Sequence, residues 1–169
     1  MIVDAAQIET IRWGVVIAAA VVAAITDLRS RRIPNALTLP ALAAGLVAGG
    51  LIGGWIGLAD AFAGCLALGL PHVMLFVFAR GGGGDAKLMA AIGAWLGLFD
   101  GLLVLLCVAL CGAVLAAIYL WWSRRTQTGD ERTDEAARGA MTMPYGVAIC
   151  GGVLAAVMGG GAGGWLWPH

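Results

Sequence analysis

The chain has 169 residues, of which 61% are hydrophobic and only 12% are charged, with a formal net charge of +0. Its mean hydropathy of +0.92 is too high for a soluble domain. The sequence contains no long basic run, so its charge pattern gives no indication of nucleic-acid binding. Several apolar stretches approach the ~20 residues that a helix needs to cross a bilayer. We therefore expect an all-α, polytopic membrane protein that forms a single integral membrane domain over residues 1–169.

About six of these stretches are expected to span the membrane. In chain order they cover about residues 11–26, 36–58, 61–79, 85–98, 102–122 and 144–166. Pro34 suits the first turn of the second helix, and Pro71 predicts a kink in the third. The fourth is short for a full crossing, and Phe99-Asp100-Gly101 is expected to form a tight turn after it.

All basic residues except Arg12, which is expected on the outer side, lie in alternate connections between these stretches. They are Arg29, Arg31, Arg32, Arg80, Lys87, Arg124, Arg125, Arg132 and Arg138. By the positive-inside rule, the loops at about 27–35, 80–87 and 123–143 face the cytoplasm. The opposite connections carry Asp60 and Asp100 but no lysine or arginine, so both termini are expected outside the cytoplasm. Asp4 and Glu9 precede the first apolar stretch, which does not fit a cleavable secretory signal.

Small residues and cysteines are expected to have structural roles. Glycine is abundant and often spaced by four, which lets membrane helices approach each other closely. Two such rows are Gly49, Gly53 and Gly57, and Gly93, Gly97 and Gly101. The four cysteines form no Cys-x-x-Cys motif and are expected to act as small buried hydrophobic residues, with no metal site.

Two aspartates differ from the other acidic residues in their position. Asp27 closes the first apolar stretch and Asp85 opens the fourth, so the predicted topology puts both at the cytoplasmic edge. Two carboxylates in a poorly solvated site can share one proton. Such a pair can activate water and protonate a leaving amine, which is the chemistry of aspartic proteases. This chemistry requires no cofactor, and none is expected.

The same residues also have structural interpretations. Asp85 would be a good N-cap for the fourth helix, and Asp27 could pair with an arginine among Arg29, Arg31 and Arg32. His72 lies beside Pro71 within an apolar stretch, where a hydrogen bond to a neighbouring helix is the first expectation and a proton relay the second. The run Gly81–Gly84 either ends a helix or supplies flexible backbone.

Three motifs resemble those of the type IV prepilin peptidases, which are membrane aspartic proteases of the Gly-x-Gly-Asp class. The first is Asp27 followed by Arg32-Ile33-Pro34-Asn35, and the second is Gly82-Gly83-Gly84-Asp85 with Lys87. The third, Pro144-Tyr145-Gly146-Val147-Ala148, is similar to the Pro-aromatic-Gly segment of the family's final helix. The motifs follow the family's order and extend over most of the chain.

The resemblance implies a multi-pass protein of the bacterial inner (cytoplasmic) membrane that cleaves prepilin leaders after a glycine at the cytoplasmic face. Asp27 and Asp85 would be the catalytic pair. The supporting residues would be Gly82, Gly84, Lys87, Pro34 and Asn35. The implied partners are the lipid bilayer and a prepilin, which has a short basic leader followed by a hydrophobic helix. The residues expected to contact this substrate are Asp130, Glu131, Asp134, Glu135 and Tyr145.

The sequence also departs from the pattern of the larger family members. Those proteins carry an insert with paired Cys-x-x-Cys motifs and N-methylate their product, whereas this sequence has neither the insert nor the motif and is similar to the short form found with Flp-type, tight-adherence pilus systems. N-methyltransferase activity and a zinc site are therefore not expected. A presenilin-like intramembrane protease is the enzymatic alternative. The non-enzymatic alternatives are a small transporter, with Asp27, His72 and Asp85 as its polar path, and a scaffold subunit of a secretion machine.

Overall fold

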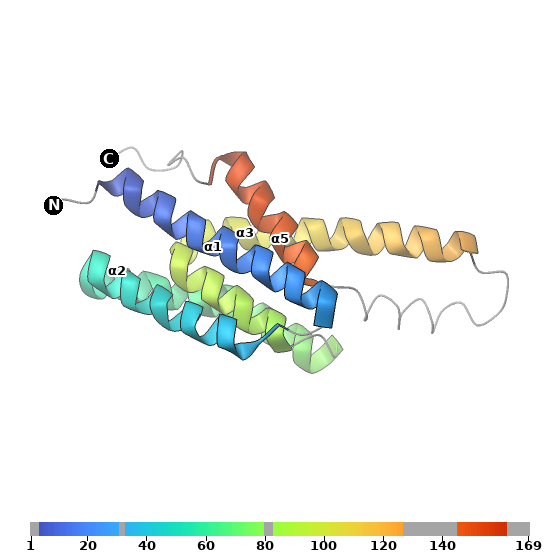
Figure 1. The fold of residues 1–169 in the computed structure, drawn as a ribbon, viewed down its shortest axis with the longest axis horizontal. Coiled ribbons are helices and arrows are strands. Elements are labelled where there is room, and N and C mark those ends of the chain that lie inside the picture. Colours follow the sequence, from blue (N-terminus) through green and yellow to red (C-terminus); the bar gives the residue numbers. More distant parts are fainter. Residues whose placement is uncertain (1–3, 31–32, 80–82, 127–144, 162–169) are drawn as a thin grey trace.

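The fold is a bundle of helices, and no strand occurs in the part of the chain that the structure describes. This computed structural model describes residues 4–30, 33–79, 83–126 and 145–161. The helices are α1 (Ala5–Ser30), α2 (Asn35–Ala79), α3 (Gly83–Thr126) and α5 (Tyr145–Ala156), followed by the π-helical η1 (Val157–Gly161) (Figure 1). The prediction of an all-α protein is confirmed.

Two of these helices are broken by a glycine and fold back on themselves. Gly54 in α2 has φ 59° and Gly97 in α3 has φ 77°, a backbone region that glycine enters without steric cost. Figure 1 shows the chain reversing at both places, so each helix consists of two halves that run in opposite directions. The predicted turns, between residues 58 and 61 and at Phe99-Asp100-Gly101, were therefore placed a few residues too late.

The reversals were misplaced because Asp60 and Asp100 look like loop residues in the sequence. In the structure both lie within helical segments. Asp60 is accommodated there because its Oδ1 accepts a hydrogen bond from the backbone N–H of Leu98, at 3.1 Å. That N–H directly follows the break at Gly97 and would otherwise lack a partner at the start of a new helical segment.

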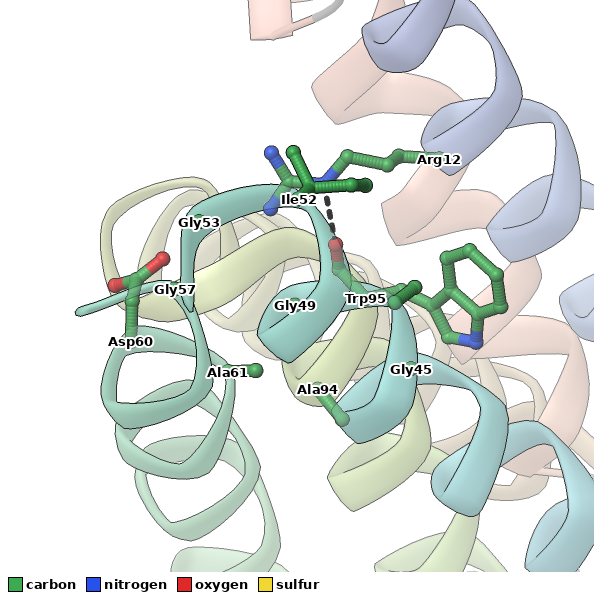
Figure 2. Close-up of a pocket in the computed structure, with 11 residues that line it drawn as sticks. Arg12, Gly45, Gly49, Ile52, Gly53, Gly57, Asp60, Ala61, Ala94 and Trp95 are labelled. Carbon is green, nitrogen blue, oxygen red and sulfur yellow. Dashed lines mark hydrogen bonds between the residues drawn. The ribbon is translucent and has the colours of Figure 1, made fainter. Parts of the chain in front are cut away.

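The other side of this break is stabilised by α1. Nε of Arg12 donates a hydrogen bond of 2.6 Å to the carbonyl oxygen of Trp95, which lies just before the break (Figure 2). The indole Nε1 of Trp95 donates to the carbonyl oxygen of Ala41 in α2, at 2.8 Å. Arg12 and Trp95 line a pocket of about 200 Å³, together with Asp60 and the glycines of α2 around its break (Figure 2). Arg12 lies in the N-terminal part of α1, whereas Asp27 lies near the C-terminal end of the same helix. Trp95 lies near the end of the first half of α3, whereas Asp85 lies near its start.

Glycines set the distance between the two reversed helices. A Cβ placed on Gly64 of α2 or Gly93 of α3 would overlap the carbonyl oxygen of the other residue, so the two backbones are in direct contact. Within α2, a Cβ on Gly49 would lie 2.8 Å from both the Cβ of Ala61 and the carbonyl oxygen of Gly57. The predicted close approach at glycine rows is thus confirmed, except that nothing lies within 4 Å of a Cβ placed on Gly53.

The core lies around α3, which packs against α2 on one side and against α1 and α5 on the other. Its fully buried side chains are Leu88, Met89, Ile92, Val104 and Val108. Large apolar residues such as Trp55 and Ile56 are instead 84% exposed, as expected for helices that face lipid. Among the described residues, three stretches are long and apolar enough to cross a membrane: Ala5–Ser30, Asn35–Leu75 and Gly83–Trp122. The chain is therefore a multi-pass membrane protein, and the count of six spans remains a prediction.

We expect Gly93→Ala to destabilise the bundle by about 1–3 kcal/mol, because the added methyl group has to separate the two backbones. The measurement is thermal unfolding of the purified protein in detergent micelles. Gly14→Ala is the matched control, since nothing lies within 4 Å of a Cβ at Gly14 in α1. Equal melting temperatures for the two variants would contradict the backbone contact between Gly64 and Gly93.

Candidate active site

Asp27 is a buried carboxylate held by the beginning of another helix. It lies in the last turn of α1 and is only 9% exposed. Its Oδ2 accepts a hydrogen bond of 2.9 Å from the backbone N–H of Gly146, the second residue of α5. The first N–H groups of a helix have no partner within that helix, and its N-terminus is a favourable place for negative charge. The start of α5 therefore fixes one oxygen of Asp27, and no described residue donates a hydrogen bond to the other, Oδ1.

Gly146 suits this contact because a side chain there would be crowded against Asp27. A Cβ on Gly146 would lie 3.0 Å from both Cβ and Oδ2 of Asp27 and 3.4 Å from the carbonyl oxygen of Ala23. The sequence places Gly146 in the Pro-Tyr-Gly segment, but its role as the donor to Asp27 was not predicted. The signal that could have indicated it is a glycine at the start of an apolar helix, in a motif that also contains an aromatic residue.

Asp85 lies within the first turn of α3. The helix begins at Gly83, so Asp85 is its third residue and not the N-cap that one interpretation of the sequence made it. Among the described residues, no hydrogen bond or ion pair involves its carboxylate. The carboxylates of Asp27 and Asp85 are close enough to interact electrostatically, although they belong to different helices. The structure thus brings the two predicted aspartates to one site.

Asp27 forms no ion pair with a described arginine, Arg29 included. Arg31 and Arg32 lie outside the described residues. The partner that the structure gives to Asp27 is a backbone N–H group, which carries no formal charge.

The supporting residues connect the start of α3 to the start of α2. Nζ of Lys87 donates a hydrogen bond of 2.9 Å to Oδ1 of Asn35. A Cβ on Gly84 would lie 2.9 Å from the Cβ of Ile33, so Gly84 allows the segment before α2 to pack against the turn that carries Asp85. The carbonyl oxygen of Pro34 accepts the N–H of Leu37 at 3.0 Å, within the first turn of α2.

Tyr145 and His72 complete the polar groups at this end of the bundle. Tyr145, the first residue of α5, lies near Asp85. Its ring lies against the imidazole of His72, with ring centres 6.0 Å apart. Nδ1 of His72 lies 3.0 Å from the carbonyl oxygen of Leu68, one turn earlier in α2. The prediction of a hydrogen bond from His72 to a neighbouring helix was therefore wrong for this nitrogen.

An apolar cavity of about 450 Å³ lies beside the first turn of α3. Gly83, Ala86, Lys87 and Ala90 line it from α3, and both halves of α2 provide the rest of its wall. Lys87 is the one charged residue of the lining, so the cavity can accept apolar side chains close to Asp85.

Several of the predicted site residues lie outside the part of the chain that the structure describes. Gly82 and the acidic residues of the loop after α3 lie outside the described residues; the latter are Asp130, Glu131, Asp134 and Glu135. The four cysteines are free and half-buried. Within the described ranges, no group of three or more histidine, cysteine or acidic residues could hold a metal ion.

Comparisons with known proteins identify the family of this chain. The model of the type IV leader peptidase family matches residues 14–117. A prepilin leader peptidase/N-methyltransferase of Aeromonas salmonicida (strain A449) is 42% identical over 95 residues, which cover 52% of this chain and 32% of the relative. The protein of the same name from Burkholderia pseudomallei (strain 1026b) is 39% identical over 105 residues, covering 58% of this chain and 34% of the relative.

The matched region is a limited part of those proteins. The chain spans about a third of the length of the curated relatives that it matches, at 32% and 34%. No solved structure matches it significantly. The family model covers more than half of the chain and includes both aspartates. The chain therefore belongs to the type IV leader peptidase family.

Proposed function

We propose that this protein is a membrane aspartic endopeptidase that removes the leader of prepilins. The observation that carries the proposal is the placement of Asp27 and Asp85, which α1 and α3 bring to the same end of the bundle, near enough for their charges to interact. Membership of the leader peptidase family supports a peptidase, and the names of the curated relatives support a prepilin substrate. The proposal covers peptide cleavage and does not extend to N-methylation.

The proposed mechanism uses the two carboxylates as one unit. One carboxylate takes a proton from a water molecule, whose oxygen attacks the carbonyl carbon of the scissile bond. The other carboxyl group gives its proton to the leaving amine as the C–N bond breaks. The N–H of Gly146 holds Oδ2 of Asp27, so Oδ1 is available for the water. The pair shares its proton, so we do not assign the base and the acid separately.

The proposed substrate has a basic leader that ends in glycine, followed by a hydrophobic helix, as in Flp-type prepilins. The basic loops predict that the site faces the cytoplasm, with both termini on the other side of the inner membrane. Cleavage would then take place where the leader leaves the bilayer. The apolar cavity beside Asp85 is suited to the apolar residues that follow the scissile bond.

The non-enzymatic alternatives have less support. A carrier binds its substrate near the middle of the membrane, whereas Asp27 and Asp85 lie at helix ends. A scaffold subunit would use the two aspartates only as structural partners, and Asp85 has none among the described residues. A presenilin-like protease would use the same two aspartates but would cleave within the bilayer.

We expect Asp27→Asn and Asp85→Asn to abolish leader removal, each lowering the rate by about 10³-fold or more, because asparagine keeps the size but cannot transfer the proton. Purified wild type and variants are reconstituted in proteoliposomes with a prepilin of the same genome. Cleavage is followed by gel shift, and the cleaved bond is identified by mass spectrometry.

Folding of each variant is checked by its melting temperature. Normal cleavage by both variants would show that the aspartates are structural. Failure of the wild type to cleave any prepilin would favour the carrier and scaffold alternatives. Cleavage within the hydrophobic helix, and not after the leader glycine, would favour the presenilin-like alternative.

Gly146→Ala is expected to lower the cleavage rate by about tenfold or more, because the new methyl group displaces the start of α5 from Asp27. The loss should appear in kcat, since Asp27 is moved while the rest of the site is retained. The matched control is Gly159→Ala in η1, where a Cβ has nothing within 4 Å. Unchanged kcat for Gly146→Ala would mean that the hydrogen bond to Asp27 does not matter for catalysis.

The acidic residues of the loop after α3 are proposed to attract the basic leader. We expect replacement of all four by alanine to raise KM by about threefold or more at low ionic strength, with kcat unchanged. The four are Asp130, Glu131, Asp134 and Glu135. A prepilin whose leader lysines and arginines are changed to glutamine is the control, since its KM should be insensitive to the loop. The same KM for wild type and variant with the basic leader would exclude this role.

A further inference from the structure

His72 is a buried histidine with one nitrogen in use and one without a partner. The side chain is only 5% exposed. Nδ1 lies 3.0 Å from the carbonyl oxygen of Leu68, which can only accept a hydrogen bond. Nδ1 must therefore carry the proton, so that Nε2 presents a lone pair and needs a donor. Among the described residues, Nε2 has no hydrogen-bond partner.

Buried polar atoms without a partner are rare in proteins and call for an explanation. Such atoms in this chain also include Nε1 of Trp13 and Oγ1 of Thr38. Trp13 lies in the part of α1 that is distant from Asp27. His72 differs from both because an aromatic residue of the proposed site lies directly against it.

Tyr145 supplies the matching chemistry. Its ring centre lies 6.0 Å from that of His72, with the two ring planes inclined by 59°. The phenol hydroxyl can rotate its hydrogen toward an acceptor, and Nε2 is an acceptor that lacks a donor. A hydroxyl and a nitrogen on rings at this separation can be joined directly or through one water molecule.

Tyr145 also stands at the point where the site is held together. It is the residue before Gly146, whose N–H binds Asp27, and it lies near Asp85. Anything that fixes the side chain of Tyr145 therefore also fixes the first turn of α5 against the two aspartates. His72 can fix Tyr145 in this way from α2. Among the long helices described, α2 is the one that carries neither of the two aspartates nor Tyr145.

We propose that His72 is a positioning residue of the peptidase site, whose Nε2 accepts a hydrogen bond from the hydroxyl of Tyr145, directly or through one water. This inference rests on the proposed function. The two bonds at the start of α5 then have complementary roles. The backbone of Gly146 orients Asp27, and the side chain of Tyr145 anchors the same turn to α2. His72 remains neutral and transfers no proton.

Two amide substitutions separate the two nitrogens of His72. Asparagine places an N–H near the position of Nδ1, so His72→Asn can keep the bond to Leu68 but loses the acceptor at Nε2. Glutamine places an amide group near the position of Nε2, so His72→Gln can accept from Tyr145. We expect His72→Asn to lower kcat by about tenfold with little change in KM, and His72→Gln to restore most of the loss.

A double-mutant cycle with Tyr145→Phe tests the partner. This variant keeps the ring and removes only the hydroxyl, so its folding should be preserved. We expect Tyr145→Phe to lower kcat about as much as His72→Asn does, and the double variant to be no slower than either single variant. Full activity of His72→Asn, failure of His72→Gln to exceed His72→Asn, or additive losses in the double variant would each overturn the proposal.

A second readout keeps this inference separate from the proposed function. The same cycle is measured as melting temperature in nanodiscs, where the hydrogen bond predicts that the shifts of the two single variants are not additive. If wild type cleaves no prepilin, the proposed function fails, and the melting temperatures still decide whether His72 and Tyr145 are coupled. Additive shifts would overturn the coupling even if the wild type is an active peptidase.

Discussion

The contact between the backbones of Gly64 and Gly93 is the constraint on which the arrangement of this bundle depends. Because neither residue has a side chain, the second half of α2 and the first half of α3 meet without spacing atoms. The first half of α3 is thereby held in the middle of the protein, with its core residues Leu88, Met89 and Ile92 fully buried. Asp85 stands at the end of this buried segment, so its position follows from helix packing and not from a loop.

Much of the fold and part of the site could be predicted from the sequence. Apolar stretches indicated a helical membrane protein, and the distribution of arginines put Asp27 and Asp85 at the same end. The turns at Gly54 and Gly97 were predicted a few residues too late, because a charge in an apolar sequence was taken to mark a loop. Asp60 instead lies within a helix, where the N–H of Leu98 from another helix satisfies it. Such a contact between distant residues leaves no local pattern in the sequence.

The same limit explains what sequence reasoning missed at the site. The motifs named Asp27, Asp85, Tyr145 and Gly146, but not the bond from the backbone of Gly146 to Asp27. A backbone N–H is common to all residues except proline, so its use as a ligand cannot be read from residue identity. His72 was noticed as an ionisable group in an apolar stretch, but its contact with Tyr145 depends on how α2 and α5 pack. The chemistry of the site could be predicted from its residue types, whereas the contacts between its residues depend on the tertiary structure.

The place of α5 in the chain has a consequence for biosynthesis. Asp27 and Asp85 are made early and enter the membrane with α1 and α3, whereas the helix whose first turn holds Asp27 is synthesised later. Translation proceeds from the N-terminus, so both aspartates are present in the nascent chain before this helix exists. A protein truncated after α3 would carry both carboxylates without the N–H that orients one of them. The proposed site would thus be completed only at a late stage of synthesis, and unfinished chains would lack the oriented carboxylate that the proposed cleavage needs.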